Sequence, residues 1–438
     1  MRSLEQTLGL SPYESYAYSY PHKTAYRTLR RPRPLKEIWA SERKDALFLY
    51  LHVPFCEMRC GFCNLFTTTN PRADFENAYL DALLRQARIV RDALGDASFA
   101  RAALGGGTPT FLSLSALDTL FESIGRVFGI VDGLPTSCET SPQTATEEKL
   151  RLLRDRGVDR VSIGVQSFIE REVNAVGRSQ KTIAVERALA CVREVGFPVL
   201  NIDLMYGLPH QTVESWTNSL EAALRYEPEE LYLYPLYVRP LTGMHRRPRE
   251  WDDVRLDCYR AGRERLLAAG YEQASMRMFR SAKTPVRAEP VYCCQEDGMV
   301  GLGCGARSYT RELHYSNEYA VGASGVREII ERYSAATAED FGAASYGFEL
   351  SEDEQRRRFV IKSLLRAEGL SLGAYRERFG SDPLEDFSEL QALLDHGLAD
   401  GDGERLLLSE RGLELSDAIG PWLYSTAVHE LSRAYELH

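Results

Sequence analysis

Three cysteines, Cys56, Cys60 and Cys63, lie within eight residues of the chain. Their C-x3-C-x2-C spacing puts three thiolates in one loop, where they can ligate three irons of a [4Fe-4S] cubane and leave the fourth iron open to a chelating ligand. A zinc site is the alternative, but structural zinc normally takes four protein ligands, and the next cysteine along the chain is Cys138. We therefore predict a redox cluster with one open coordination position.

Short apolar segments on both sides of this loop alternate with longer amphipathic ones. The apolar segments, which we predict to be strands, are residues 47–53, 99–104, 136–139, 160–164, 199–204 and 230–235. Alternation of this kind predicts repeated βα units and a parallel sheet. Six such units suit an open, three-quarter (βα)6 barrel, in which ligands bind at the carboxyl ends of the strands.

The residues that could bind a ligand are therefore those at or just after the predicted strands. They are Tyr50, Gly105, Gly106, Gly107, Thr108, Glu139, Gln166, Arg178 and Asp203. The three glycines allow a close approach of backbone to a ligand, although an ordinary strand-to-helix turn also uses glycine. A carboxylate such as Glu139 can accept two hydrogen bonds, although an ion-paired loop acid would give the same pattern. Taken singly, the other polar residues fit a solvated rim and Tyr50 fits a core aromatic.

The predicted barrel occupies the middle of the chain. Residues 1–45 are rich in Tyr, Pro and Arg without a clear period, and we expect an irregular arm there. Residues 46–310 form the barrel and its extension. Residues 311–438 form a smaller, mainly helical domain, because 370–416 has the order of a winged helix with a hairpin at 401–403. The expected fold class is α/β, a partial (βα)6 barrel with a winged-helix-like C-terminal domain.

The composition of the 438 residues narrows the class of protein. A content of 44% hydrophobic and 26% charged residues is typical of a globular chain, and no apolar run is long enough for a membrane span. The net charge of -10 argues against nucleic acid as the main partner, because phosphate binding needs clustered Lys and Arg. Nine cysteines without a secretory signal suit a reducing compartment. We expect a cytoplasmic protein that binds neither membrane nor nucleic acid.

The cysteine loop and the motifs around it resemble one known family. In chain order the motifs are Tyr50-Leu-His52-Val-Pro54-Phe55-Cys56, Gly105-Gly106-Gly107-Thr108-Pro109, Glu139, Gly164-Val165-Gln166-Ser167-Phe168, Arg178 and Asn201-Ile-Asp203-Leu-Met-Tyr-Gly207-Leu-Pro209. Together they resemble the HemN-like radical S-adenosylmethionine (SAM) family, which includes the oxygen-independent coproporphyrinogen III oxidases, and the likeness covers most of the chain. The resemblance implies a cluster on the three cysteines that cleaves SAM reductively, and an electron donor such as flavodoxin or ferredoxin.

The resemblance also implies a role in SAM binding for the residues at the strand ends. The backbone of the glycine motif at 105–108 would lie against the aminoacyl group of SAM, and Glu139 would accept hydrogen bonds from the ribose hydroxyls. Gln166, Arg178 and Asp203 would bind other polar groups of SAM, and Tyr50 would help to anchor it.

The sequence departs from the oxidases of this family at one informative position. Those enzymes carry a further cysteine two residues after the third ligand, where this chain has Leu65. The region expected to bind a second SAM also differs, around Cys293, Cys294 and Arg307. We therefore predict that the chain binds two SAM molecules and transfers a methyl or methylene group to an sp2 carbon of a small-molecule substrate. The reaction would be a C-methylation or a cyclopropanation. A methyltransferase is a candidate partner.

Two alternative functions stay open. One is an oxygen-independent coproporphyrinogen III oxidase, which the tyrosine-rich arm around Tyr18-Ser19-Tyr20-Pro21 favours. The other is a haem chaperone of the same superfamily, in which the cluster serves haem loading rather than turnover.

Overall fold

The computed structural model of the chain describes residues 3–130, 133–246, 253–284 and 294–437. The chain divides into two compact units. The barrel unit consists of Arg27–Arg265, Lys283–Gly347 and Glu436–His438, and the C-terminal unit consists of Met1–Tyr26, Leu266–Ala282 and Phe348–Tyr435. The start of the expected arm therefore groups with the C-terminal unit, whereas the residues that follow it belong to the barrel unit.

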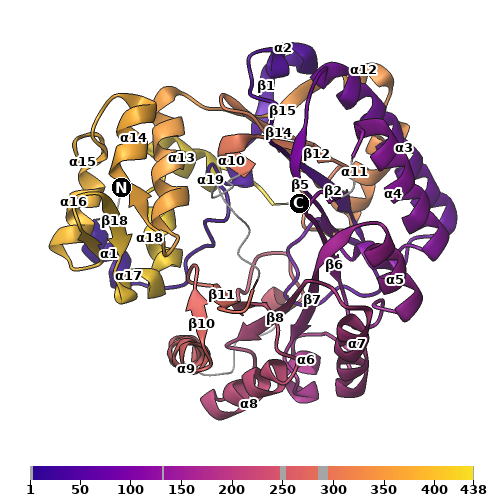
Figure 1. Ribbon diagram of the computed structural model, residues 1–438. Helices are drawn as coiled ribbons and strands as arrows, with labels where there is room; N and C mark the ends of the chain where they lie inside the picture. The colour runs from indigo at the N-terminus through magenta and orange to yellow at the C-terminus, as the bar shows by residue number, and fades with distance from the viewer. Residues whose placement is uncertain (1–2, 131–132, 247–252, 285–293, 438) are drawn as a thin grey trace. The chain divides into compact units, whose positions relative to one another are not determined.

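Six parallel strands form the centre of the barrel unit (Figure 1). In sheet order they are β2 (Leu47–Val53), β5 (Phe99–Gly106), β6 (Thr136–Thr140), β7 (Val158–Gln166), β8 (Val199–Tyr206) and β9 (Glu230–Pro235). The helices between them are α3 (Ala73–Leu94), α4 (Leu114–Phe128), α5 (Glu147–Asp155), α6 (Glu170–Ala175), α7 (Thr182–Val195) and α8 (Val213–Leu224). The predicted α/β fold with a parallel core is confirmed.

The helices form where the sequence supplies both an apolar stripe and end signals. Helix α4 begins at Ser113, whose side chain accepts a hydrogen bond from the Ala116 N–H, and it ends at Gly129, whose φ of 60° is left-handed. Its stripe of Leu117, Leu120, Ile124 and Phe128 is buried against the sheet.

Side chains on the strands alternate between the helix-covered face and the inner face of the barrel. On β8, Leu200, Ile202 and Leu204 are completely buried on the helix side. Asn201 and Asp203 therefore share the inner face, and the same alternation brings the polar residues of β6, β7 and β9 to that face.

The sheet of the barrel unit continues beyond β2. Strand β12 (Met299–Leu302) pairs with β2 in parallel, and it is followed in sheet order by β13 (Arg307–Tyr309), β14 (Leu313–Ser316), β15 (Ala343–Glu349) and β1 (Arg27–Pro34). The remaining elements of this unit are α2 (Leu35–Ala40), β3 (Phe55–Cys56), β4 (Thr68–Thr69), η2 (Pro109–Phe111), η3 (Met244–Arg246), most of α9 (Arg255–Ala268), α10 (Cys294–Asp297), α11 (Ala323–Ala335) and α12 (Ala338–Phe341).

The C-terminal unit is mainly helical, as predicted. Its helices are α1 (Leu4–Leu8), η1 (Lys23–Ala25), α13 (Glu352–Leu364), α14 (Leu372–Phe379), α15 (Pro383–Asp386), α16 (Ser388–Asp395), α17 (Glu410–Glu414), α18 (Ser416–Trp422) and α19 (Thr426–Arg433). A small antiparallel sheet has the order β16 (Leu370–Ser371), β18 (Arg405–Leu408) and β17 (Ala399–Gly401). The antiparallel pair β10 (Tyr271–Gln273) and β11 (Met278–Ser281) also belongs to this unit.

The N-terminal segment is held to this unit by buried polar contacts. Tyr20 is fully buried, and its hydroxyl donates a hydrogen bond to the Glu354 carboxylate on α13. Ser425 Oγ donates to the other oxygen of Glu354 at 2.7 Å, and Lys362 Nζ donates to the Tyr18 carbonyl at 2.6 Å. Within the described residues, no helix has the length and apolar character needed to cross a membrane.

Candidate functional site

The three cysteines lie in a loop that is closed at its base by strand pairing. Cys56 ends β3, which pairs in parallel with β4, so the chain returns to the same edge after the loop. Inside the loop the Cys63 N–H donates to the Cys60 carbonyl at 3.0 Å. All three cysteines are free and partly exposed.

Side chains contact each of the three sulfurs, and two of these side chains are distant in sequence. Thr108 Oγ1 donates to Cys56 Sγ at 3.5 Å, and the Arg178 guanidinium donates to Cys60 Sγ at 3.3 Å. Cys63 Sγ lies 3.9 Å from Thr67 Oγ1. Two of the residues predicted for SAM binding are thus neighbours of the predicted cluster ligands.

The fit of a cluster to this loop can be judged from its packing. A Cβ at Gly107 would lie 3.0 Å from Cys56 Sγ and 2.6 Å from the Phe55 carbonyl, so this position requires glycine for the loop to approach β5. Burial raises the pKa of Cys56 to about 12 and also raises that of Cys63, so the charge of bound iron is what would deprotonate these thiols.

No three His, Cys, Asp or Glu side chains among the described residues form a group that could hold a single metal ion. The ligands of a cubane each bind a different iron, so three thiolates need to surround a cluster rather than meet at one point. The free thiols, the glycine at 107 and the hydrogen bonds to sulfur fit such a cluster, and the assignment of the three ligands stays a prediction.

Glu139 and Asp203 form the acidic part of the candidate site. Glu139 is exposed at the end of β6, and its Oε2 accepts a hydrogen bond from the Gly106 N–H at 3.1 Å. Its carboxylate is nevertheless enclosed by protein on several sides, and this desolvation together with the charge of Asp203 raises the pKa of Glu139 to about 7. Burial raises the pKa of Asp203 to about 6, against the hydrogen bond from Asn201 at 2.8 Å.

The glycines of the predicted motif make room for these groups. A Cβ on Gly105 would lie 2.9 Å from the Glu139 carboxylate, and Gly106 has a φ of 109°, which side chains rarely adopt. The carboxylate therefore lies directly against the backbone of the glycine motif, which an ordinary turn would not require.

The other predicted residues occupy different surroundings. Arg178 is 7% exposed, and besides Cys60 it donates to the Gly164 carbonyl at 2.6 Å. Gln166 ends β7 with a φ of 68°, and a Cβ on Gly164 would lie 2.9 Å from its Nε2. The Tyr50 hydroxyl lies 3.4 Å from His52 Nδ1, so Tyr50 contacts a residue of the cluster lead-in. Of the cysteines noted beyond the barrel, Cys293 lies outside the described residues.

Sequence reasoning missed a second group of polar residues deeper in the barrel. Arg160 on β7 forms an ion pair with Glu230 on β9 at 2.8 Å, and Ser162 and Asn201 join them on the inner face. The sequence signal for these inner-face residues was the alternation of polar and apolar residues with a period of two along the strands. We treated those strands as uniformly apolar.

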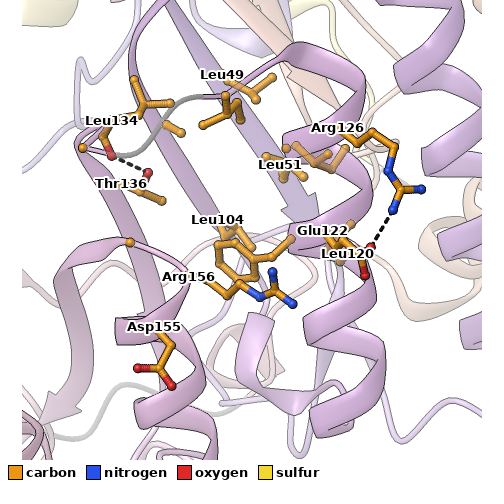
Figure 2. Close-up of a pocket in the computed structure, with 17 residues that line it drawn as sticks. Leu49, Leu51, Leu104, Leu120, Glu122, Arg126, Leu134, Thr136, Asp155 and Arg156 are labelled. Carbon is orange, nitrogen blue, oxygen red and sulfur yellow. Dashed lines mark hydrogen bonds and ion pairs between the residues drawn. The ribbon is translucent and has the colours of Figure 1, made fainter.

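A hollow elsewhere in the barrel unit is not part of this site (Figure 2). It lies between α4 and the strands, with Leu49, Leu51 and Leu104 among its lining residues. These alternate with Tyr50 and Gly105, so the hollow opens on the opposite face of the sheet from the candidate site.

Comparison with known proteins agrees with this geometry. Residues 50–223 match the family model of the Radical SAM superfamily, and residues 350–415 match the HemN C-terminal domain. The chain is 28% identical over 419 residues to the oxygen-independent coproporphyrinogen III oxidase of Bradyrhizobium diazoefficiens, which covers 89% of this chain and 90% of that protein. It is 30% identical over 275 residues to the heme chaperone HemW of Escherichia coli, covering 59% of this chain and 69% of HemW.

Solved structures give the same result. Coproporphyrinogen III oxidase (HemN) from Escherichia coli superimposes with a TM-score of 0.78 at 25% sequence identity, covering 94% of this chain and 97% of that chain. The likeness therefore extends through both units.

These relatives correct the function that we predicted. Methyl or methylene transfer, and with it a partner methyltransferase, is wrong, because the relatives are named as oxidases or haem chaperones. The error came from giving one missing side chain, at Leu65, more weight than a likeness that runs through nearly the whole chain. Membership of the superfamily implies a [4Fe-4S] cluster and SAM, and a second SAM is not shown. The chain belongs to the HemN-like family of radical SAM enzymes.

Proposed function

We propose that the chain is a radical SAM oxidase that acts on coproporphyrinogen III or a closely related porphyrinogen. The observation that supports this most strongly is the likeness to the Escherichia coli oxidase over 94% of this chain and 97% of that chain. The heme chaperone HemW of Bacillus subtilis covers less of this chain, 84%, although it is matched over 97% of its own length.

In this proposal Cys56, Cys60 and Cys63 hold the cluster through three irons. When bound and reduced, the cluster supplies the electron that cleaves SAM to methionine and a 5'-deoxyadenosyl radical. Thr108 and Arg178 donate hydrogen bonds to two of the three sulfurs, which holds those side chains in place and withdraws electron density from them.

The residues around the glycine motif bind SAM. The backbone at 105–107 lies beside the Cys56 sulfur on one side and the Glu139 carboxylate on the other, so it can take the aminoacyl group between them. Glu139 accepts hydrogen bonds from the ribose hydroxyls, because it is an exposed residue whose carboxylate is held beside the glycine motif by the Gly106 N–H. Asp203, Gln166 and Tyr50 complete the polar lining.

A haem chaperone is the second candidate, and Leu65 is the observation that favours it. Leu65 is 49% exposed beside the cluster loop, at the position where the oxidases of the family carry a cysteine. A protein that binds haem without oxidising a porphyrinogen would not need that thiol.

One experiment separates the two candidates. The reconstituted protein is incubated anaerobically with coproporphyrinogen III, SAM and dithionite, and the products are separated by chromatography. Harderoporphyrinogen together with 5'-deoxyadenosine supports the oxidase, and a parallel reaction with the Leu65→Cys variant tests whether the thiol raises the rate. Tight haem binding in an anaerobic titration without any decarboxylation would support the chaperone and overturn the oxidase.

Three further parts of the proposal have separate tests. A soluble electron donor such as flavodoxin or ferredoxin should replace dithionite in the assay. The number of SAM molecules per chain, one or two, follows from calorimetric stoichiometry. A cytoplasmic location is checked by cell fractionation.

A further inference from the structure

The inner face of the barrel that carries the two carboxylates of the candidate site also holds an ion pair to which no role has been given. Arg160 Nε donates to Glu230 Oε2 at 2.8 Å, and Arg160 Nη1 donates to Ser137 Oγ at 3.0 Å. The guanidinium also lies over the Tyr232 ring, with 6.0 Å between its central carbon and the ring centroid. The Arg160 side chain is 24% exposed and that of Glu230 is 8% exposed, so this is a largely buried pair.

The register of the strands places Arg160 one inward-facing position below Glu139, and it places Glu230 level with Asn201 and Ser162. Ser162 on β7 pairs with Glu139 on β6 and with Asn201 on β8, and Arg160 precedes Ser162 by one inward-facing position. Polar contacts connect the layers, because Asn201 Nδ2 donates to Ser162 Oγ at 2.7 Å and Ser162 Oγ donates to Asp203 Oδ2 at 3.3 Å.

The charges in this interior oppose one another. The negative charge of Asp203 makes it harder for Glu139 to ionise. The positive charge of Arg160 favours the ionised form of both carboxylates, whereas the negative charge of Glu230 disfavours the ionised form of Asp203. Arg160 and Glu230 therefore act on these carboxylates with opposite signs.

We propose that the Arg160–Glu230 pair sets the charge of the SAM ribose site: Arg160 keeps Glu139 and Asp203 ionised as hydrogen-bond acceptors, and Glu230 limits its effect. Both are positioning residues, since they act through the two carboxylates. The inference rests on the proposed function in one respect, the binding of SAM at Glu139 and Asp203.

Other charged and titratable groups share the inner face and remain unchanged in the test. From the neighbouring strands they are Tyr50 and His52 on β2, Arg101 on β5, and Tyr232 and Tyr234 on β9. Any pH dependence common to all variants belongs to them, and only the differences between variants report on the pair.

The test uses two single substitutions in the full-length, cluster-reconstituted protein, with SAM affinity measured by anaerobic calorimetry. Arg160→Gln should raise the pKa of both carboxylates. A rise of one unit from about 7 and about 6 reduces the doubly ionised fraction at pH 7 about tenfold, so SAM should bind about tenfold more weakly. At pH 9 both groups are ionised in either protein, and the affinities should agree within about twofold.

Glu230→Gln should change the affinity in the opposite direction. It removes the negative charge that disfavours ionised Asp203, so the pKa of Asp203 should fall. At pH 5.5 the variant should bind SAM about threefold more tightly than wild type does. This is the gain expected from lowering a pKa of about 6 by one unit. Both substitutions break the same ion pair, so a purely structural role would weaken binding in both. Opposite signs support the charge role, and equal losses at every pH overturn it.

Two controls keep the inference testable if Arg160→Gln folds poorly. Arg160→Lys keeps the charge and should bind SAM within about threefold of wild type at pH 7, while Arg160→Gln/Glu230→Gln should fall between the two single variants. Thermal melting checks that each variant folds. If Arg160→Gln does not fold, SAM binding by Glu230→Gln that is weaker than that of wild type at pH 5.5 is sufficient to overturn the inference. Failure of wild type to bind SAM at all would instead overturn the SAM site of the proposed function.

Discussion

Substitution of Glu139 tests the proposed SAM site most locally. Glu139 is an exposed residue whose carboxylate lies against the backbone of the glycine motif and is held by the Gly106 N–H at 3.1 Å. Glu139→Ala removes the acceptor and its charge. Glu139→Gln keeps the size of the side chain and an oxygen that can still accept from Gly106, so it isolates the effect of the charge.

The expected loss follows from the type of hydrogen bond. A hydrogen bond to a charged group contributes about 1.5–3 kcal/mol, which corresponds to about tenfold to hundredfold weaker SAM binding in Glu139→Ala. The Gln variant should lose about tenfold, because it keeps a neutral acceptor. The measurement belongs at pH 8, because a pKa of about 7 leaves Glu139 mostly ionised there.

The assay is anaerobic calorimetry on reconstituted protein, with the visible absorption of the cluster recorded for each variant. The absorption should not change, because Glu139 is not among the predicted ligands. Glu122→Gln is the matched control, since Glu122 is an exposed acid on α4 that forms an ion pair with Arg126 at 2.5 Å. If Glu139→Ala bound SAM as tightly as wild type does, the ribose assignment would be refuted.

Three further predictions concern the loop, the protons and the C-terminal unit. Gly107→Ala should prevent reconstitution to full iron content. Gly125→Ala should reconstitute normally, because the added Cβ would meet no heavy atom within 4 Å outside its own helix, and equal iron content in both variants would contradict the packing argument. SAM binding favours the ionised carboxylates of Glu139 and Asp203, whose pKa values are about 7 and about 6. Binding should therefore release about one proton at pH 6.5 and almost none at pH 8.5. Calorimetry in buffers of different ionisation enthalpy measures the number of protons released. Glu354→Ala leaves the buried hydroxyls of Tyr20 and Ser425 without their acceptor. It should lower the free energy of unfolding by about 2–5 kcal/mol, as measured by a urea titration. An unchanged midpoint of unfolding would show that these hydrogen bonds are not stabilising.

The central strands could be predicted because their signal is local. Each is a short apolar run between amphipathic segments, and every predicted strand is present with ends that differ by no more than two residues, as for 160–164, which is Val158–Gln166 in the structure. Glu139 and Asp203 could be placed on the same side of the sheet for the same reason, because the carboxyl ends of all its parallel strands lie at one edge.

The parts that escaped prediction depend on contacts between distant residues. The arm has no period because its order comes from tertiary hydrogen bonds, such as that from Lys362 to the Tyr18 carbonyl, and local sequence does not encode the partner. Strand β12 joins β2 from 250 residues away, and the chain between them gives no signal of that pairing. Arg160 was overlooked because its strand was treated as a uniformly apolar run although polar and apolar residues alternate along it, and its ion-pair partner Glu230 lies two strands away.

The most direct test of the central claim is reconstitution of the protein with iron and sulfide under anaerobic conditions, followed by reduction in the presence of SAM. The account predicts about four irons and four sulfides per chain and formation of 5'-deoxyadenosine that depends on the reductant. It also predicts that the variant with Cys56, Cys60 and Cys63 all replaced by Ala loses both. If that triple variant still cleaves SAM, the claim that these cysteines hold the cluster is contradicted.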